Sequence, residues 1–306
     1  MATDVTMQVV DPSPGAGAAL TAAEQVFTDV AASCTRFDPR SPLMRANAAS
    51  RQWHCVPAEL YAALEEAHSA HVVTDGAFDP RVLRRLEEWG YDRTLPFRAG
   101  DVSVARVPGS GASRPPRRPW RPRFDRARGA VRIGREPVDL GGIGKGLAVR
   151  WASQVLAGAG RAVLVEAGGD LFAAGPGPDG TGWRVGVEDP RGGPDPVAVL
   201  GLEDLGCATS SVRVRHWRVN GRAVHHIVDP RTGEPADSGL LSVTVVGPDP
   251  ALAEIWSKAL FLAGRGRVRR LADERGIAAL LVDTDGFVGV SRPMRQHLVW
   301  QAPRGF

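Results

Sequence analysis

The second half of the chain contains a run of strand-like segments that follow one another without a helix between each pair, and this run constrains the fold most. A segment such as residues 183–189 places Trp183, Val185 and Val187 on one face at a period of two, as in a half-buried strand. Because helices do not alternate one for one with these segments, the order favours an α+β architecture over a doubly wound parallel sheet. The segments are AVLVEAGGD (162–170), WRVGVED (183–189), LSVTVVG (241–247) and IAALLVDTDGFVGVS (277–291).

Amphipathic helices are expected beside these strands. Residues 21–34 begin with a Thr21/Glu24 capping box, and Pro57 stands at the start of a second helical pattern that extends to Val73. Two more helices are expected after the glycine block at 141–146 and at AEIWSKALFLAG (253–264). With 306 residues, 43% of them hydrophobic, the chain has enough material for a large core. We therefore expect a single α+β domain over residues 1–306, with mixed sheets and flanking helices.

Residues 97–128 have a different composition. This segment is dense in Pro, Gly and Arg and has no hydrophobic periodicity, which predicts a surface loop. Its arginines could attract phosphate-rich partners, but the whole chain has 38 basic and 34 acidic residues, a net charge of only +4. So small an excess is weak evidence for a polyanionic partner, and we expect no nucleic-acid binding.

The N-terminal sequence and the cysteines indicate in which cellular compartment the protein is expected. The start MATDVTMQVVDPSPG lacks a basic segment followed by an apolar run, and no stretch is long and apolar enough for a membrane span. We therefore expect a cytoplasmic protein. Cys34, Cys55 and Cys207 are odd in number, widely spaced and without a CxxC pair, which argues against a disulfide framework and a thiolate metal site. Each is expected in or near the core.

Four glycines surround a lysine where a strand-like segment meets a helix. Gly141, Gly142, Gly144 and Gly146 flank Lys145, and glycines at such a junction let backbone amides approach an anion. A phosphate group is the natural occupant. The spacing matches neither the P-loop nor the GxGxxG dinucleotide motif. The alternative is a tight turn with a solvated lysine.

Two further acidic positions lie beside glycines. Asp139 precedes the glycine block, where a carboxylate could hold a cation, accept hydrogen bonds from a ligand, or cap the following helix. Gly168, Gly169 and Asp170 follow a buried strand. They are consistent with close backbone approach to a ligand or with a sharp bend.

The segment HHIVDPRTGEPADSG gathers several chemically active side chains. His225, His226 and Asp229 lie in it together with Pro230. Imidazole is the side chain best suited to take a proton from a hydroxyl near neutral pH. Paired histidines can also bind zinc, but no third ligand at the spacing of an HExxH motif is present, so proton transfer is the favoured role.

The segment TDGAFDP combines turn residues with an aromatic side chain. Phe78 and Asp79, with Trp89 and Gly90 some ten residues later, suggest an exposed turn whose aromatics could stack on a flat ring. The alternative is an ordinary helix start capped by Asp79.

Taken in order, these blocks resemble the family of FAD:protein FMN transferases, also called ApbE-like proteins. Several such blocks in the right order are more specific than any one of them, and only residues 97–128 have no counterpart. The blocks are FDPRSPLMRAN (37–47), TDGAFDPRV (74–82) with a following WG, VDLGGIGKGLAV (138–149), VEAGGDLFAAG (165–175), ATS (208–210), HHIVDPRTGEPA (225–236), SVTVVGPDP (242–250) and AEIWSKALFLAG (253–264).

The resemblance implies a T-fold-related α+β architecture with an FAD cleft, in an enzyme that moves FMN from FAD to a Ser or Thr hydroxyl of a target flavoprotein with release of AMP. It implies that His226 helps to activate the hydroxyl and that Lys145 acts in catalysis and in FAD binding. Met1 is a looser match to a flavin contact. The other implied cofactor-binding residues are Phe37, Ala77, Phe78, Asp79, Asp139, Gly168, Gly169, Asp170, Thr209, Ser210 and Ile227.

The implied magnesium site departs from the family pattern. The carbonyl of Gly142 matches one metal ligand, but the Asp and Thr that the family carries four residues apart are here Glu254 and Lys258. An ammonium group has no lone pair, so Lys258 cannot be a ligand, and Mg²⁺ is doubtful. The pair could equally form a surface ion pair on a helix.

This departure leaves several functional alternatives open. Lys258 could place its charge where the metal would lie, or Glu254 could hold a weaker metal with water completing its shell. The chain could also have become a non-catalytic FAD-binding protein, or an FAD hydrolase that gives FMN and AMP.

Overall fold

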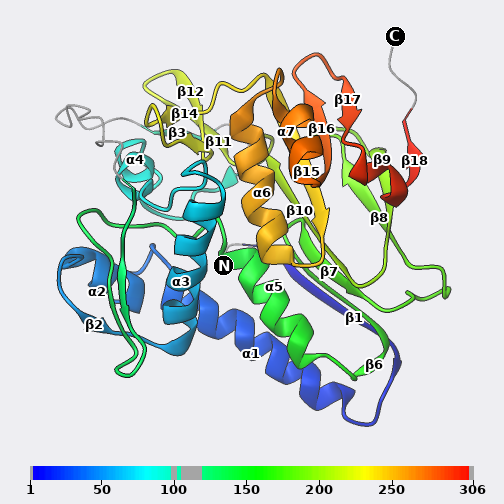
Figure 1. Cartoon of the computed structure of the whole chain (residues 1–306), viewed down its shortest axis with the longest axis horizontal. Coiled ribbons are helices and arrows are strands. Elements are labelled where there is room, and N and C mark those ends of the chain that lie inside the picture. Colours follow the sequence, from blue (N-terminus) through cyan, green and yellow to red (C-terminus); the bar gives the residue numbers. More distant parts are fainter. Residues whose placement is uncertain (1–2, 98–101, 105–118, 303–306) are drawn as a thin grey trace. The chain divides into compact units, whose positions relative to one another are not determined.

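The computed structural model describes residues 3–97, 102–104 and 119–302, and the chain divides into two compact units (Figure 1). Unit 1 comprises Met1–Thr28, Lys145–Arg213 and Asp237–Phe306. Unit 2 comprises Asp29–Gly144 and Val214–Ala236. Helix α1 (Ala16–Cys34) runs without a break through the boundary between residues 28 and 29. Each unit is therefore assembled from segments that are distant in the sequence.

Unit 1 contains a seven-stranded sheet in the order β1-β6-β7-β10-β15-β16-β17. Every pairing in this sheet is antiparallel. The α+β architecture expected from the order of the segments is thus confirmed. The strands are β1 (Val5–Pro12), β6 (Gly160–Ala167), β7 (Asp170–Ala174), β10 (Leu205–Ser211), β15 (Leu240–Gly247), β16 (Ala278–Asp283) and β17 (Val288–Val290).

Two hairpins of this sheet follow from their turn residues. Gly168 and Gly169 connect β6 to β7, and both have positive φ, 57° and 89°. A two-residue turn with both residues in this region suits glycine, which has no Cβ, and its twist matches that of the paired strands. Gly286, with φ 83°, lies in the turn between β16 and β17, as predicted.

A second sheet of unit 1 has the order β18-β9-β8 and shares a core with the first. It consists of β8 (Trp183–Glu188), β9 (Pro196–Leu202) and β18 (Leu298–Gln301). Trp183 and Val187 of β8 are buried, in keeping with the predicted period of two. They belong to one hydrophobic cluster with side chains such as Leu280 of β16. Burial of these apolar faces against each other holds the two sheets together.

Helix α6 (Pro250–Ala263) packs against β10 and β15 and crosses them in Figure 1. It begins where the side chain of Asp249 accepts hydrogen bonds from the amides of Ala251 and Leu252, with Pro250 in the first turn. Such a cap contributes on the order of 1 kcal/mol to stability. Unit 1 also contains α5 (Gly144–Val155) from Lys145 onward, α7 (Val268–Arg275) and the 3-10 helix η2 (Pro293–His297).

Unit 2 combines helices with short strands. Its core includes Trp89 and Trp217, whose indole N–H donates to the carbonyl of Trp89 at 2.8 Å. The helices are α2 (Pro42–Ala48), α3 (Ala58–Val73) and α4 (Leu83–Glu88). The sheets are β2-β5-β4 (His54–Cys55, Ala130–Arg132, Arg123–Asp125), β12-β11-β3 (Arg222–His225, His216–Val219, Ser103–Val104) and β13-β14 (Val228–Asp229, Glu234–Pro235).

Two sequence expectations are corrected by the fold. Helix α1 begins at Ala16 rather than Thr21, whose hydroxyl donates to the carbonyl of Gly17 instead of capping a helix. Cys55 is exposed, because it lies on a short strand at the surface. The described helices include none that is long and apolar enough to cross a membrane.

The described parts of the Pro/Arg-rich segment are not all surface loop. Residues 98–101 and 105–118 lie outside the described residues, but Ser103–Val104 and Arg123–Asp125 form strands. Trp120 is 3% exposed, and its indole N–H donates to the carbonyl of Ile133 at 3.0 Å. The burial of Trp120 could not be predicted from the sequence, because a single aromatic side chain in a segment rich in Pro and Arg produces no periodic pattern.

Candidate active site

Four charged side chains of unit 1 meet where β7, α5 and α6 come together. Lys145 of α5 forms ion pairs with Asp170 of β7 and with Glu254 of α6, the latter at 3.6 Å. Lys258 of α6 contacts the same oxygen of Glu254, Oε1, at 3.1 Å. We call Lys145, Asp170, Glu254 and Lys258 the four-charge cluster. The side chain of Glu254 is 1% exposed, so the expectation of a surface ion pair with Lys258 is wrong.

Burial and the two lysines set the charge state of the cluster. Burial raises the pKa of Asp170 to about 6, against the opposing effect of Lys145. Burial would also raise the pKa of Glu254, but Lys258, Lys145 and the amide of Gly146 together hold it at about 2. At neutral pH both carboxyls are therefore ionised, and two buried anions are balanced by two ammonium groups.

The glycine block has a packing role as well as a possible role in binding. Helix α5 begins at Gly144, so Gly146 lies inside the helix, and its amide donates to Glu254 Oε2 at 2.8 Å. A Cβ on Gly146 would lie 2.7 Å from the Cα of Ala251 and from the carbonyl oxygen of Pro250. Gly146 thus lets α6 approach α5 closely, and its amide serves Glu254 rather than a phosphate.

The other cofactor-binding candidates of unit 1 lie on adjacent strands. Gly168 and Gly169 form the exposed turn that leads into Asp170. On β10, the Thr209 hydroxyl is 2.9 Å from that of Thr244, and the buried Ser210 hydroxyl is 2.7 Å from that of Ser257. The glycine turn is therefore open to solvent, while Ser210 connects its strand to α6.

The residues present do not fit a magnesium site. Glu254 Oε1 faces two ammonium groups and Oε2 accepts an amide, while Lys258 offers no lone pair. Across residues 3–97, 102–104 and 119–302, no group of three or more His, Cys, Asp or Glu side chains could hold a metal ion. Gly142, the other expected ligand, lies in the turn before α5.

In unit 2, Asp139 is buried and paired with an arginine that the sequence analysis did not identify. Arg36 Nε lies 3.2 Å from Asp139 Oδ2, and the amide of Gly141 donates to Asp139 Oδ1 at 2.5 Å. The Arg36 guanidinium lies 4.2 Å from the ring centroids of both Phe37 and Tyr91. Because α5 begins at Gly144, Asp139 lies too far before the helix to cap it. Arg36 contacts both Asp139 and the exposed ring of Phe37.

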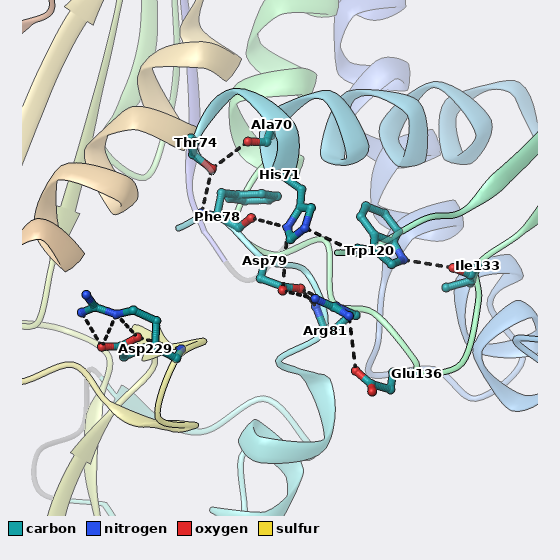
Figure 2. A network of polar contacts seen from close by, with 11 residues as sticks. Ala70, His71, Thr74, Phe78, Asp79, Arg81, Trp120, Ile133, Glu136 and Asp229 are labelled. Atoms are coloured by element: carbon teal, nitrogen blue, oxygen red, sulfur yellow. Dashed lines mark hydrogen bonds and ion pairs between the residues drawn. The ribbon is translucent and has the colours of Figure 1, made fainter. Parts of the chain in front are cut away.

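The segment with Phe78 and Asp79 is held by a buried histidine (Figure 2). His71 Nε2 accepts the amide of Trp120 at 3.1 Å, so the ring proton is on Nδ1. This Nδ1 donates to the carbonyl of Phe78 at 3.1 Å and lies 3.7 Å from Asp79 Oδ2. Arg81 Nη2 pairs with the same carboxylate at 2.6 Å.

These contacts correct two expectations for this segment. Phe78 is 5% exposed, and its amide is held by the hydroxyl of Thr74, so the aromatic is not on an exposed turn. Asp79 does not cap α4, because α4 begins at Leu83 after Val82 and the Asp79 carboxylate instead accepts the amide of Arg81, which precedes the helix. We call His71, Asp79, Arg81 and Trp120 the His71 network; no spacing in the sequence indicates it.

The two adjacent histidines differ in their surroundings. His225 Nε2 lies 3.0 Å from the carbonyl of Ala236, and its Nδ1 accepts the amide of Ile227 at 3.3 Å. Both ring nitrogens therefore bond to backbone, and burial lowers the pKa of His225. His226 Nδ1 lies 3.3 Å from the carbonyl of Arg215, which can only accept, so in the neutral ring the lone pair is on Nε2.

The remaining candidates of unit 2 flank these groups. Ile227 is 4% exposed, beside the histidines, and Ala77 is partly exposed immediately before Phe78. Asp229 accepts three hydrogen bonds from the Arg231 side chain and a fourth from the Arg231 amide. Met1 lies outside the described residues.

Comparison with known proteins gives consistent matches along the chain. The model described as "ApbE family" matches residues 1–281. The FAD:protein FMN transferase of Treponema pallidum is 30% identical over 298 residues, which cover 88% of this chain and 79% of that protein. The enzyme of the same name from Klebsiella pneumoniae is 29% identical over 151 residues, or 49% of this chain. That match spans only 43% of the Klebsiella protein, less than half of its length.

Solved structures have the same fold. The ApbE protein of Thermotoga maritima superposes with a TM-score of 0.77 at 30% identity, covering 96% of this chain and 94% of that one. The flavinyl transferase ApbE of Pseudomonas stutzeri superposes with a TM-score of 0.75 at 21% identity, covering 97% of each chain.

Proposed function

Because the chain belongs to the ApbE family, we propose that it transfers the FMN half of FAD to a Ser or Thr hydroxyl of a target flavoprotein and releases AMP. The proposal draws on matches to named FAD:protein FMN transferases and on the side chains described above. The candidate residues for FAD fall in both units.

The observation that carries this proposal is the different bonding of the two histidines. His225 bonds to backbone through both ring nitrogens, and burial disfavours its charged form. The bond from His226 Nδ1 to Arg215 fixes a tautomer whose Nε2 can take a proton. His226 is therefore the candidate base, and His225 fixes the backbone that carries it.

The reaction needs a positive charge close to the pyrophosphate. A hydroxyl oxygen that attacks the FMN-side phosphorus approaches an anion, so the site must neutralise charge and align the attack. The side chains of Lys145 and Lys258 are 14% and 19% exposed, beside carboxylates that are almost fully buried. This arrangement presents cations rather than anions to a ligand.

The proposed step balances without a redox partner. The acceptor oxygen forms a bond to the FMN-side phosphorus, and the bond from that phosphorus to the bridging oxygen breaks. His226 Nε2 takes the hydroxyl proton, and AMP leaves with the bridging oxygen. The product is an FMN phosphoester of the acceptor.

The acceptor and the compartment stay predictions. A Ser or Thr in a target flavoprotein remains the expected nucleophile, and a cytoplasmic location remains expected. Magnesium enters none of the steps above, because Glu254 and Lys258 already pair with each other.

The test is the intact mass of a candidate acceptor flavoprotein after incubation with this protein and FAD. We expect the mass to increase by one FMN, with one AMP released per acceptor. Replacing the acceptor hydroxyl residue by Ala abolishes the increase. AMP release without any adduct identifies hydrolysis instead, and tight FAD binding with neither product identifies a binding protein.

Histidine variants connect this activity to the structure. His226→Ala is expected to slow transfer by about 100-fold or more, the usual contribution of a general base. His216 is an exposed histidine of the same unit, on β11, and serves as the matched control. Equal losses in His216→Ala and His226→Ala would contradict the role given to His226.

A further inference from the structure

Lys258 occupies a distinctive place in the four-charge cluster. It lies one helical turn after Glu254 on α6, and its Nζ contacts Glu254 Oε1 at 3.1 Å and the Glu254 carbonyl at 3.4 Å. Both of these contacts are with one residue, while an ammonium group has three N–H donors. The Lys258 side chain is 19% exposed, and among the described residues the two contacts with Glu254 leave one N–H of the ammonium group for a ligand oxygen.

The same contacts exclude a divalent cation at Glu254. A hard cation would need the lone pairs of the carboxylate, but Oε1 already faces Lys145 and Lys258, and Oε2 accepts the amide of Gly146. A cation beside Oε1 would also lie within a few ångströms of two ammonium groups. Repulsion between like charges at such distances opposes binding.

The cluster also explains why Lys258 is held in place. Glu254 is 1% exposed, and a buried carboxylate without a counter-charge is strongly destabilising. Asp170 pairs with Lys145, so Lys258 is the second cation that balances the two anions. The helix spacing from i to i+4 places Lys258 beside Glu254 in the favourable order.

We propose that the Lys258 ammonium takes the place of a divalent cation in this protein, so that it neutralises a pyrophosphate oxygen of FAD itself and flavin transfer proceeds without metal. The proposal rests on the proposed function and adds a catalytic residue to it. Lys258 donates an N–H to the phosphate oxygen that gains charge as the phosphorus–oxygen bond to AMP breaks, and the Glu254 carboxylate holds Lys258 in position.

The first measurement is metal binding, which does not depend on turnover. Manganese(II) is titrated into the protein in the presence of FAD and followed by the paramagnetic resonance signal of the free ion. We expect no binding to the unmodified protein and clear binding to Lys258→Thr, which removes the ammonium and supplies a hydroxyl oxygen. Binding to the unmodified protein, or to neither protein, overturns the proposal.

The second measurement is the rate of AMP release from FAD in the presence of the acceptor flavoprotein, with magnesium and with chelator. The rate of the unmodified protein is expected to be the same in both. Lys258→Thr should lose about 100-fold in chelator, as when one preorganised donor to a developing charge is removed, and should recover with magnesium. A rate of the unmodified protein that vanishes in chelator and returns with magnesium overturns the proposal.

Two further variants separate these effects from misfolding. Lys258→Met keeps most of the length of the side chain but has neither its charge nor an oxygen ligand for magnesium, so its rate should fall and magnesium should not restore it. Arg270→Thr removes the cation of an exposed pair on α7, Arg270 with Glu274 at i to i+4, and should change neither measurement. Thermal unfolding verifies that each variant is folded.

The two proposals can fail separately. If the unmodified protein releases no AMP under any condition, the proposed function fails, while the manganese titration still decides whether Lys258 excludes a metal. If AMP is released only with magnesium, the proposed function stands and the role of Lys258 is refuted.

Discussion

The four-charge cluster of unit 1 and the His71 network of unit 2 both bury carboxylates, but they stabilise them differently. In the cluster, Asp170 faces the ammonium group of Lys145, while Glu254 faces those of Lys145 and Lys258 and also accepts the amide of Gly146. In the network, Asp79 faces the planar guanidinium of Arg81, while His71 bonds mainly to backbone atoms.

The different kinds of cation indicate that the cluster and the network have different roles. Ammonium groups are compact charges that can turn toward a ligand, whereas a guanidinium bonded through two nitrogens to one carboxylate fixes geometry. We infer that the cluster supplies charge, while the network holds the backbone around Phe78 and Asp79 in one conformation (Figure 2).

The largest effect is expected from Glu254→Ala, which leaves the cluster with one carboxylate and two cations. Breaking a buried ion pair by removing one partner costs about 3 to 5 kcal/mol in the free energy of unfolding. Denaturant unfolding measures this loss. Glu274→Ala is the control, because Glu274 forms an exposed pair with Arg270 and its loss should leave stability unchanged. Similar midpoints for both variants would refute a charge-balanced cluster.

His71→Leu tests the network and should have the next largest effect. It removes the partner of the Trp120 amide and of the Phe78 carbonyl, both within buried residues, at a cost of about 2 to 3 kcal/mol. FAD affinity, measured by flavin fluorescence, should fall as well, since the segment around Phe78 loses its hydrogen bond to His71. His71→Gln, which can both donate and accept, should recover part of each loss. Loss of stability with unchanged affinity would confine His71 to a structural role.

Gly146→Ala separates packing from charge in unit 1. The added Cβ would lie 2.7 Å from α6 backbone atoms, so α5 and α6 must move apart at a cost of about 1 to 3 kcal/mol. Gly144→Ala is a matched control in the same helix, because its Cβ would meet nothing within 4 Å. Thermal unfolding should rank Gly144→Ala at or above the unmodified protein and Gly146→Ala well below it. Equal values would mean that α6 does not depend on the small residue.

Much of the fold could be predicted from local patterns. The alternation of Trp183 and Val187, the glycine turn before Asp170 and the apolar helix that contains Glu254 are signals contained within a few residues. The errors arose where one long-range contact decides the outcome. Trp120 is buried because it reaches His71 and Ile133, and no periodic pattern in a Pro/Arg-rich segment indicates such a contact.

In the candidate site, too, local features could be predicted from the sequence and long-range contacts could not. Lys145 and His226 stand out by residue type and by neighbouring glycines or histidines. The pairing of Lys145 with Asp170 spans 25 residues, and that of Gly146 with Glu254 spans 108, so neither could be predicted from spacing. The helical spacing of Glu254 and Lys258 did predict their ion pair, but the burial of Glu254 depends on how α6 packs against β10 and β15.

The smallest expected effect is the contribution of Asp170, in the four-charge cluster, to the pH dependence of the free energy of unfolding. Burial raises the pKa of Asp170 to about 6, above its ordinary value of 3.8, so the folded state binds a proton that the unfolded state has already lost. The stability from this group is complete below pH 3.8 and is lost as the pH rises through 6. Between pH 5 and 7 the loss amounts to roughly 1 kcal/mol. Denaturant midpoints at both pH values, in the unmodified protein and in Asp170→Asn, isolate this contribution from other titrating groups.

Asp170→Asn should remove that part of the slope, because an amide does not titrate in this range. His225 acts in the opposite direction, since its lowered pKa makes stability fall as the pH drops below 6.5, and it is present in both proteins. The difference between the two slopes therefore reports Asp170. If the slopes are identical, Asp170 does not take up a proton in this range, and the ammonium groups stabilise its charge more strongly than burial opposes it.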